Sequence, residues 1–194
     1  MPSASLYSIS EASMWYDMLY AWYLMIPVIL GGCSHMIIVK YNHFSALNVP
    51  LAVSCFGANK TWRGLLLVPL LTALFALLWL PIGQLHSPRE ILPILIEECC
   101  FAGLLAGFGY ILPELPNSWL KRKLGIPPGK LPVRHRAFFI FGDQIDSAIG
   151  VTLAYTLYFK LPATSAALIF VIFLLSAFVV KQLLYLLALK KTRF

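Results

Sequence analysis

Long apolar segments separated by polar ones form the main pattern of this chain. Five of these segments are long enough to cross a bilayer, because a membrane-spanning helix needs about 20 mostly apolar residues. The predicted spans cover residues 18–39, 64–82, 91–112, 137–159 and 163–188. Two longer polar segments, residues 40–63 and 113–136, follow the first and third spans. The pattern predicts an all-α polytopic membrane protein with one integral membrane domain over residues 1–194.

Composition narrows the class further. The chain is 60% hydrophobic and 12% charged, and its mean hydropathy of +0.80 excludes an ordinary soluble domain. Its four cysteines and four histidines lack the paired spacing of a zinc site. The glycine-rich motifs of soluble nucleotide-binding loops are also missing from the sequence. We therefore predict membrane lipids around the chain, no zinc centre and no nucleic-acid partner.

Positive charge is concentrated on one predicted side of the membrane. The two long loops and the C-terminal tail carry twelve lysines and arginines, whereas the opposite side carries only Arg89 and Lys160. Because cytoplasmic loops are enriched in these residues, we predict that the N-terminus lies outside and the C-terminus inside. Both long loops are then cytoplasmic. We expect the chain in the cell (plasma) membrane, with its active site on the cytoplasmic side.

Five charged residues fall inside predicted spans. Lys181 lies in the last span, Glu97 and Glu98 lie in the third, and the other two are at the start of the fourth. Charges at membrane depth are costly and usually paired, so we expect Lys181 to pair with Glu97 or Glu98. Whether Glu97 or Glu98 has a direct catalytic role stays open. Gly103 and Gly107, four residues apart in the third span, predict close helix packing.

Two carboxylates, Asp143 and Asp146, stand at the start of the fourth predicted span. Their spacing of three places both on one face of a helix. Oxygen ligands on one face suit a hard cation such as Mg²⁺, which in turn suits phosphate chemistry. Glu114, at the exit of the third span, is a candidate third ligand or a solvent-exposed acid. We therefore predict Mg²⁺ as the cofactor.

The first long loop contains a candidate phosphate site. Lys60 and Arg63 lie three residues apart where the second span should begin, and Asn59 adds a polar neighbour. Free backbone N–H groups and the helix dipole favour anions at such a helix N-terminus. The alternative is that these bases bind lipid headgroups.

The second long loop contains a similar candidate site. A short helix beginning near Asn117 would place Ser118, Lys121 and Arg122 on one face, and Gly125 would end it. The alternative is a basic amphipathic segment lying on anionic lipid.

Three motifs now resemble, in order, those of CTP-dependent cytidylyltransferases that make CDP-activated lipids. They are Lys60-Thr-Trp-Arg-Gly64, Ser118-Trp-Leu-Lys-Arg122 followed by Gly125, and Asp143-Gln-Ile-Asp-Ser147. In size the chain is most similar to CDP-archaeol synthases, the compact relatives of phosphatidate cytidylyltransferase.

The resemblance implies transfer of CMP from CTP to a lipid phosphate, giving CDP-lipid and pyrophosphate for phospholipid biosynthesis. It implies Mg²⁺ held by Asp143 and Asp146 with help from Glu114, and catalytic roles for both aspartates, Lys60 and Lys121. The implied substrate-binding residues are Asn59, Lys60, Arg63, Asn117, Ser118, Lys121 and Arg122.

Other properties stay open. Glu114 stands where the relatives usually carry an aspartate, which leaves the lipid chains and the glycerol stereochemistry open. The number of metal ions and a homo-oligomeric state are not predicted by the sequence either. One alternative function is a CDP-alcohol phosphotransferase, although its longer multi-aspartate run is missing. The other is a non-enzymatic lipid-binding or transport protein, which would need no nucleotide.

Overall fold

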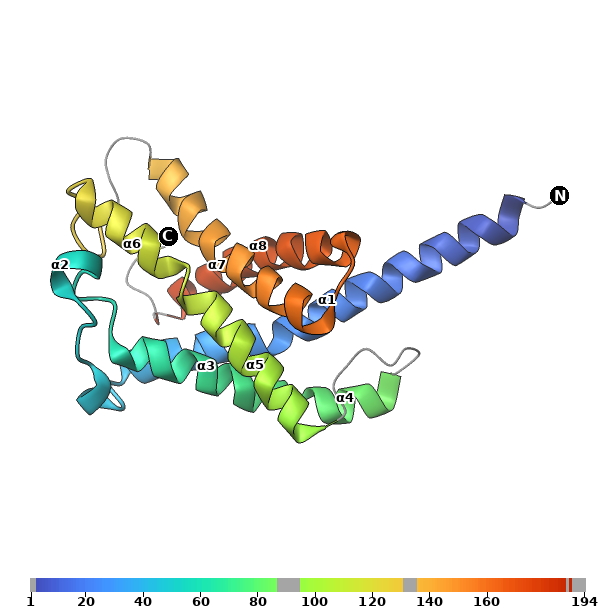
Figure 1. The fold of residues 1–194 in the computed structure, drawn as a ribbon, viewed down its shortest axis with the longest axis horizontal. Coiled ribbons are helices and arrows are strands. Elements are labelled where there is room, and N and C mark those ends of the chain that lie inside the picture. Colours follow the sequence, from blue (N-terminus) through green and yellow to red (C-terminus); the bar gives the residue numbers. More distant parts are fainter. Residues whose placement is uncertain (1–2, 87–94, 131–135, 188, 190–194) are drawn as a thin grey trace.

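The computed structural model describes residues 3–86, 95–130, 136–187 and 189, which are mostly helical (Figure 1). Within these ranges there is no strand, and one isolated bridge joins Pro50 to Thr61. The elements are α1 (Ser3–Lys40), the 3-10 helix η1 (Ser45–Leu47), α2 (Val53–Phe56), α3 (Trp62–Ala76), α4 (Trp79–His86), α5 (Ile96–Ile111), α6 (Glu114–Lys123), α7 (Arg136–Phe159) and α8 (Ala163–Leu186). The predicted all-α fold is confirmed.

Four helical stretches of the described chain are long and apolar enough to cross a membrane. They are Trp15–Lys40, Trp62–Ile82, Ile96–Lys123 and Ala163–Leu186. These stretches correspond to four of the five predicted spans and support an integral membrane protein.

The fifth predicted span corresponds to α7, which is 24 residues long, as α8 is. α7 is not among the four stretches because it is less apolar than they are: Asp143, Gln144 and Asp146 fall in its first half. The count of five spans and the orientation across the membrane therefore stay predictions.

Element bounds differ from the predicted spans in two places. α1 begins at Ser3 rather than near residue 18 and runs for 38 residues. The predicted span 64–82 is divided into α3, which ends at Ala76, and α4, which begins at Trp79. Between them, the N–H of Leu77 donates to Leu74 O at 3.3 Å, a tighter turn than that of an α-helix. The start of the predicted span 91–112 lies outside the described residues.

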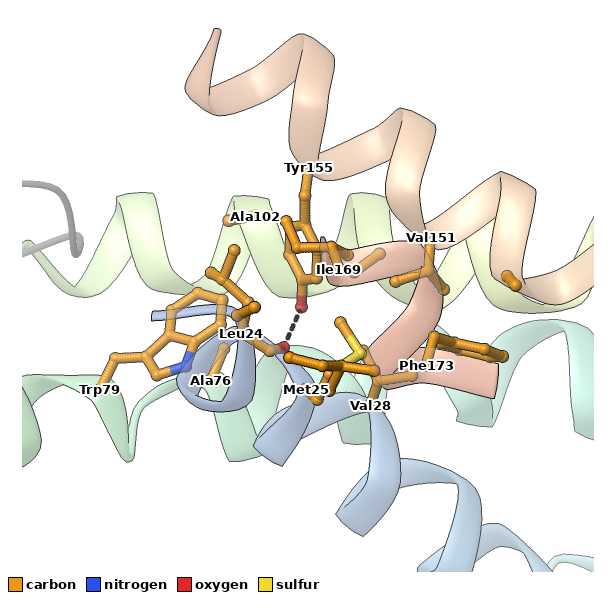
Figure 2. Packing of buried hydrophobic residues seen from close by; sticks show 14 of the residues in the cluster. Leu24, Met25, Val28, Ala76, Trp79, Ala102, Val151, Tyr155, Ile169 and Phe173 are labelled. Atoms are coloured by element: carbon orange, nitrogen blue, oxygen red, sulfur yellow. Dashed lines mark hydrogen bonds between the residues drawn. The ribbon is translucent and has the colours of Figure 1, made fainter. Parts of the chain in front are cut away.

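Five helices close into a bundle. α1 packs against α3 and α8, α5 packs against α3 and α7, and α7 packs against α8. The core between them is apolar (Figure 2), and two of its fully buried aromatic residues, Trp79 and Tyr155, have their polar atoms hydrogen-bonded. The hydroxyl of Tyr155 donates to Leu24 O at 2.9 Å, and Trp79 Nε1 donates to Tyr23 O at 2.7 Å. These bonds matter because an unpaired buried polar group is destabilising.

Glycines allow the backbones to approach closely. A Cβ added at Gly107 would lie 2.4 Å from Pro69 Cα, so the predicted packing role of this glycine is confirmed. A Cβ at Gly150 would lie 1.9 Å from Gly109 O, so α5 and α7 touch backbone to backbone at this point. This contact brings the end of α5 beside the middle of α7, about one helical turn after Asp146.

Candidate functional site

The short helix α6 presents one polar face. It starts directly after the end of α5, at Glu114, and packs against α7 and α2. Glu114, Asn117 and Lys121 recur at spacings of three and four residues, so they share one side of the helix. The predicted short helix is confirmed, although it begins at Glu114, three residues before Asn117.

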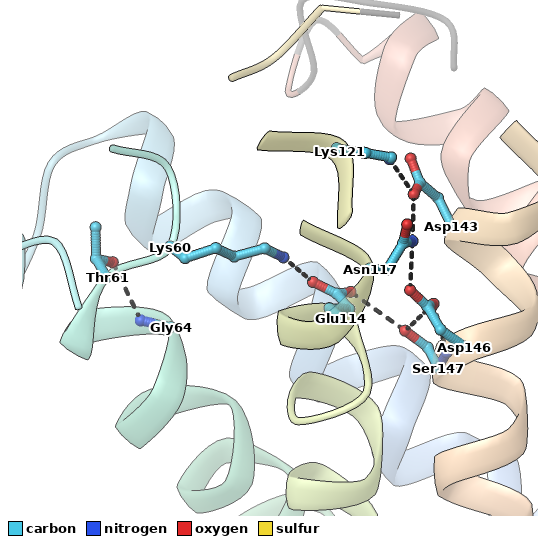
Figure 3. A network of polar contacts seen from close by, with 9 residues as sticks. All are labelled: Lys60, Thr61, Gly64, Glu114, Asn117, Lys121, Asp143, Asp146 and Ser147. Carbon is cyan, nitrogen blue, oxygen red and sulfur yellow. Dashed lines mark hydrogen bonds and ion pairs between the residues drawn. The ribbon is translucent and has the colours of Figure 1, made fainter. Parts of the chain in front are cut away.

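Asn117 joins the two aspartates of α7. Its Nδ2 donates to Asp143 Oδ1 at 2.6 Å and to Asp146 Oδ2 at 2.7 Å (Figure 3). One nitrogen reaches both carboxylates, so these two oxygens lie within two hydrogen-bond lengths of each other. The prediction that both aspartates share one helix face is therefore confirmed.

Two ion pairs and a hydroxyl extend this network. Lys121 Nζ pairs with Asp143, and Lys60 Nζ from the first loop pairs with Glu114. Ser147 Oγ donates to Glu114 Oε1 at 3.2 Å, and the N–H of Ser147 donates to Asp146 Oδ1 at 2.6 Å. The network of three carboxylates and two ammonium groups runs continuously from the first loop through α6 to α7 (Figure 3).

A polar cavity of about 440 Å³ contains this network. Its size lies within the range usual for small-molecule sites. Every predicted site residue except Arg63 lines it. Its walls also contain Met36 of α1, Lys130 after α6, and Lys181 of α8. Residues from both long loops and from two membrane helices therefore converge on one space.

Arg63 lies elsewhere. Its guanidinium is buried, with 5% of the residue exposed, and Nη1 donates at 3.2 Å both to Asn42 Oδ1 and to His43 O. Asn42 and Phe44 have left-handed backbone conformations, with φ of 54° and 53°. Arg63 thus secures the turn that follows α1, and its predicted substrate contact stays a prediction.

A second cavity, of about 460 Å³, contains Arg63 and shares Lys60 and Glu114 with the first. The Lys60–Glu114 ion pair therefore stands between two polar spaces. The N-terminus of α3 borders the second space, and its Gly64 N–H donates to Thr61 Oγ1 at 3.4 Å. This side-chain cap uses one of the N–H groups that the sequence suggested for anion binding.

The expected pairing of Lys181 with Glu97 or Glu98 is wrong. Among the described side chains, Lys181 has no ion pair with either acid, and the carboxylates whose charges reach it include Glu114, Asp143 and Asp146. Glu97 and Glu98 stand at the start of α5 and Glu114 just after its end, about 24 Å away along a helix of that length. A lone lysine in an apolar segment indicates an anionic group nearby. From the sequence, this group was expected at the start of α5, whereas Lys181 lines the cavity that contains Glu114.

The residues fit a magnesium ion through two carboxylates. Asp143 and Asp146 converge on the Asn117 amide, and oxygen donors suit Mg²⁺. A half-turn of the Asn117 side-chain amide exchanges its nitrogen and oxygen, so the amide oxygen can also face the point between the two carboxylates. In the part of the chain described, no three His, Cys, Asp or Glu residues are arranged to hold a metal ion. Glu114 faces Lys60 and Ser147 instead, so its predicted part in a metal shell stays a prediction.

The chain matches a known protein family over nearly its whole length. The sequence profile of the CDP-archaeol synthase (CarS-like) family matches residues 14–194. No curated protein and no solved structure matches the chain. The family match covers both loops, the polar cavity, α1 from residue 14 onward and the helices from α2 to α8. The chain therefore belongs to the CDP-archaeol synthase family.

Proposed function

We propose that this protein transfers CMP from CTP to a lipid phosphate and releases pyrophosphate. One observation carries the proposal: all three resembling motifs contribute to a single polar cavity at one end of an apolar helix bundle. A water-soluble nucleotide and a membrane lipid need a site of this kind, with polar walls beside a membrane interior. Family membership supports the reaction class.

The reaction forms one phosphorus–oxygen bond and breaks another. An oxygen of the lipid phosphate attacks the α-phosphorus of CTP, and the bond from that phosphorus to the oxygen bridging to the β-phosphate breaks. The products are CDP-lipid and pyrophosphate. A phosphate monoester has a second pKa of about 6 and is largely a dianion at neutral pH. The attacking oxygen needs no strong general base, so catalysis consists mainly of positioning and charge stabilisation.

Basic side chains of the cavity would stabilise the phosphate charge. Lys121 and Lys60 are held by carboxylates, and these contacts aim their ammonium groups into the cavity. Nε and Nη1 of Arg122 are buried and have no hydrogen-bond partner among the described residues, so this guanidinium is a free donor for a triphosphate. Asn59 and Ser118 line the same space and would orient the nucleotide.

Asp143 and Asp146 would hold Mg²⁺, which when bound neutralises charge on the nucleotide phosphates. In the protein itself, Asn117 and Lys121 keep the two carboxylates together. Glu114 and Ser147 tie the first loop to α7, which keeps Lys60 beside them. We further propose that the lipid is archaetidate- or phosphatidate-like, used for phospholipid synthesis, and that the site faces the cytoplasm from the cell membrane.

The test is a turnover assay on the purified full chain with Mg²⁺, CTP and lipid phosphates of ether and ester type. Pyrophosphate and CDP-lipid, measured by mass, should appear in equal amounts and disappear with EDTA. Asp143→Asn should abolish turnover. Glu97→Gln is the matched control, since it neutralises an exposed acid at the opposite end of α5.

Three results would contradict the proposal. Normal turnover in Asp143→Asn would remove the metal assignment. In a parallel reaction with CDP-lipid and an alcohol acceptor in place of CTP and lipid phosphate, release of CMP without pyrophosphate would identify a CDP-alcohol phosphotransferase instead. A folded protein with neither CTP binding nor turnover would be a lipid-binding or transport protein.

A further inference from the structure

Lys181 occupies an unusual position on α8. Except for Gln182, the residues of the helix around it are apolar, and its side chain is half-buried. Lys181 makes no hydrogen bond or ion pair with any described residue, whereas Lys60 and Lys121 are both paired. Its charge interacts at longer range with the carboxylates of the polar cavity. A lysine that is placed there without a direct partner can meet an anion without first breaking a salt bridge.

A third cavity, which is apolar, meets the polar cavity of the three carboxylates at this residue. It has a volume of about 120 Å³ and lies between α1 and α8, with Tyr110 of α5 at its edge. Gly32, Cys33 and Ala177 are among its lining residues. Most of its lining residues are half-buried rather than buried, so the cavity is open along one side. Lys181 and Met36 line both cavities and therefore mark their junction.

We propose that Lys181 binds the phosphate of the lipid substrate, and that the first part of the lipid chains lies in the apolar cavity between α1 and α8. This proposal rests on the proposed function, and it gives the lipid phosphate, one of the two substrates, a binding site at Lys181. An amphiphile with an anionic head and apolar tails fits a junction where an apolar cavity ends at a cation. CTP has no apolar part that would occupy the smaller cavity.

The two substrates would then approach from different sides. The Arg122 guanidinium lies beside loop residues, with Nη1 3.6 Å from where a Cβ on Gly57 would stand. Lys181 comes from a membrane helix. Asp143 and Asp146 line the same cavity as both of these bases. A triphosphate held from the loops and a lipid phosphate held from α8 would meet at the two aspartates.

The first experiment measures binding without turnover. Purified full chain in detergent is titrated with dioleoylglycerol phosphate, with diphytanylglycerol phosphate, and with uncharged dioleoylglycerol, and separately with CTP. Lys181→Met should weaken binding of the phosphate-bearing lipid that the wild type prefers by about tenfold or more, the usual loss for one hydrogen bond to a charged group. Binding of CTP and of dioleoylglycerol should change less than twofold. Lys181→Arg keeps the cation and should restore binding to within about threefold.

The second experiment tests the cavity. A Cβ at Gly32 meets no atom within 4 Å and Gly32 lines the apolar cavity, so the side chain of Gly32→Leu should occupy part of this cavity. A Tm within a few degrees of the wild type is required of this variant. It should weaken binding of long-chain lipid phosphates but leave dihexanoylglycerol phosphate unaffected. Lys181→Met should weaken binding of both chain lengths. Gly32→Ala is the smaller control, with an intermediate effect.

Turnover separates this inference from the proposed function. Lys181→Met should raise KM for the lipid phosphate about tenfold with KM for CTP unchanged, whereas a general loss of structure would lower kcat with every substrate. Unchanged lipid KM in an active Lys181→Met enzyme would overturn the inference and leave the function standing. Lipid-phosphate binding that depends on Lys181, in a wild type that turns over no lipid, would support the site and overturn the function. If Lys181→Met is not monodisperse, Lys181→Gln replaces it.

Discussion

The Asn117 amide offers a direct test of the convergence between Asp143 and Asp146. Asn117→Asp preserves the shape of the side chain but replaces the shared donor with a third carboxylate. Both hydrogen bonds, of 2.6 and 2.7 Å, are lost, and three anionic groups face each other across the same short distances. Without a divalent cation the variant should therefore be less stable than the wild type.

The magnitude follows from the two bonds. A hydrogen bond to a charged group contributes about 1.5–3 kcal/mol. The side chain of Asp143 is 35% exposed, so water screens part of this interaction and the lower end applies to it. With the lower end for the bond to Asp143 and the full range for the bond to Asp146, the loss is about 3–4.5 kcal/mol for the two bonds. For a chain of this size, each kcal/mol lowers Tm by about 2–4 °C, so Tm should fall by about 6–18 °C.

The assay is thermal unfolding in detergent, with EDTA or with millimolar Mg²⁺. Mg²⁺ should raise the Tm of Asn117→Asp more than that of the wild type, since a third carboxylate strengthens cation binding. Asn59→Asp is the matched control, because Asn59 lines the same cavity and has no hydrogen bond to either aspartate. Equal Tm values for Asn117→Asp and the wild type in EDTA would refute the convergence of the carboxylates.

Two further predictions concern packing and charge. Gly150→Ala should lower the free energy of unfolding by about 1–3 kcal/mol, since the added methyl would overlap Gly109 O. The control Gly142→Ala, on the same helix, meets no atom and should be neutral or stabilising. Unfolding measurements that show equal effects of the two changes would contradict the α5–α7 contact. Lys60→Glu and Glu114→Lys should each lower Tm, and the double variant should recover stability through a coupling of about 0.5–3 kcal/mol. The double variant should still lack turnover, because residue 60 then carries a carboxylate where the nucleotide needs a cation. Tm losses that simply add in the double variant would show that the two side chains do not pair.

Much of the fold and of the site was predictable from local pattern. Four apolar segments became membrane-length helices because length and hydropathy determine whether a helix is stable in a bilayer. The spacing of Asp143 and Asp146 placed both on one face, since neighbours three apart on a helix always lie on one side. The short helix of the second loop was found for the same reason, with its start three residues too late.

Contacts between distant segments were not predictable in this way. Lys181 was assigned to the acids at the start of α5, although it lies with those near Glu114 at the other end. The bonds from Arg63 to the turn after α1 were not predictable either, and its substrate contact stays a prediction. The number of charged side chains in a segment does not show which other segment they will contact in the folded bundle.

The sequence by itself determined the helical class, the two loops, the carboxylates on one face, and the motifs by which the family can be recognised. These features depend on interactions within about one helical turn, or on the polarity of whole segments. The tertiary structure alone decided that α6 and α7 share the Asn117 bridge, that Lys60 pairs with Glu114, and that Lys181 joins a polar to an apolar cavity. The physical reason is that helix pairing depends on side-chain fit over the whole bundle. The backbone contact between Gly109 and Gly150 sets how α5 meets α7, and no local pattern encodes that partner.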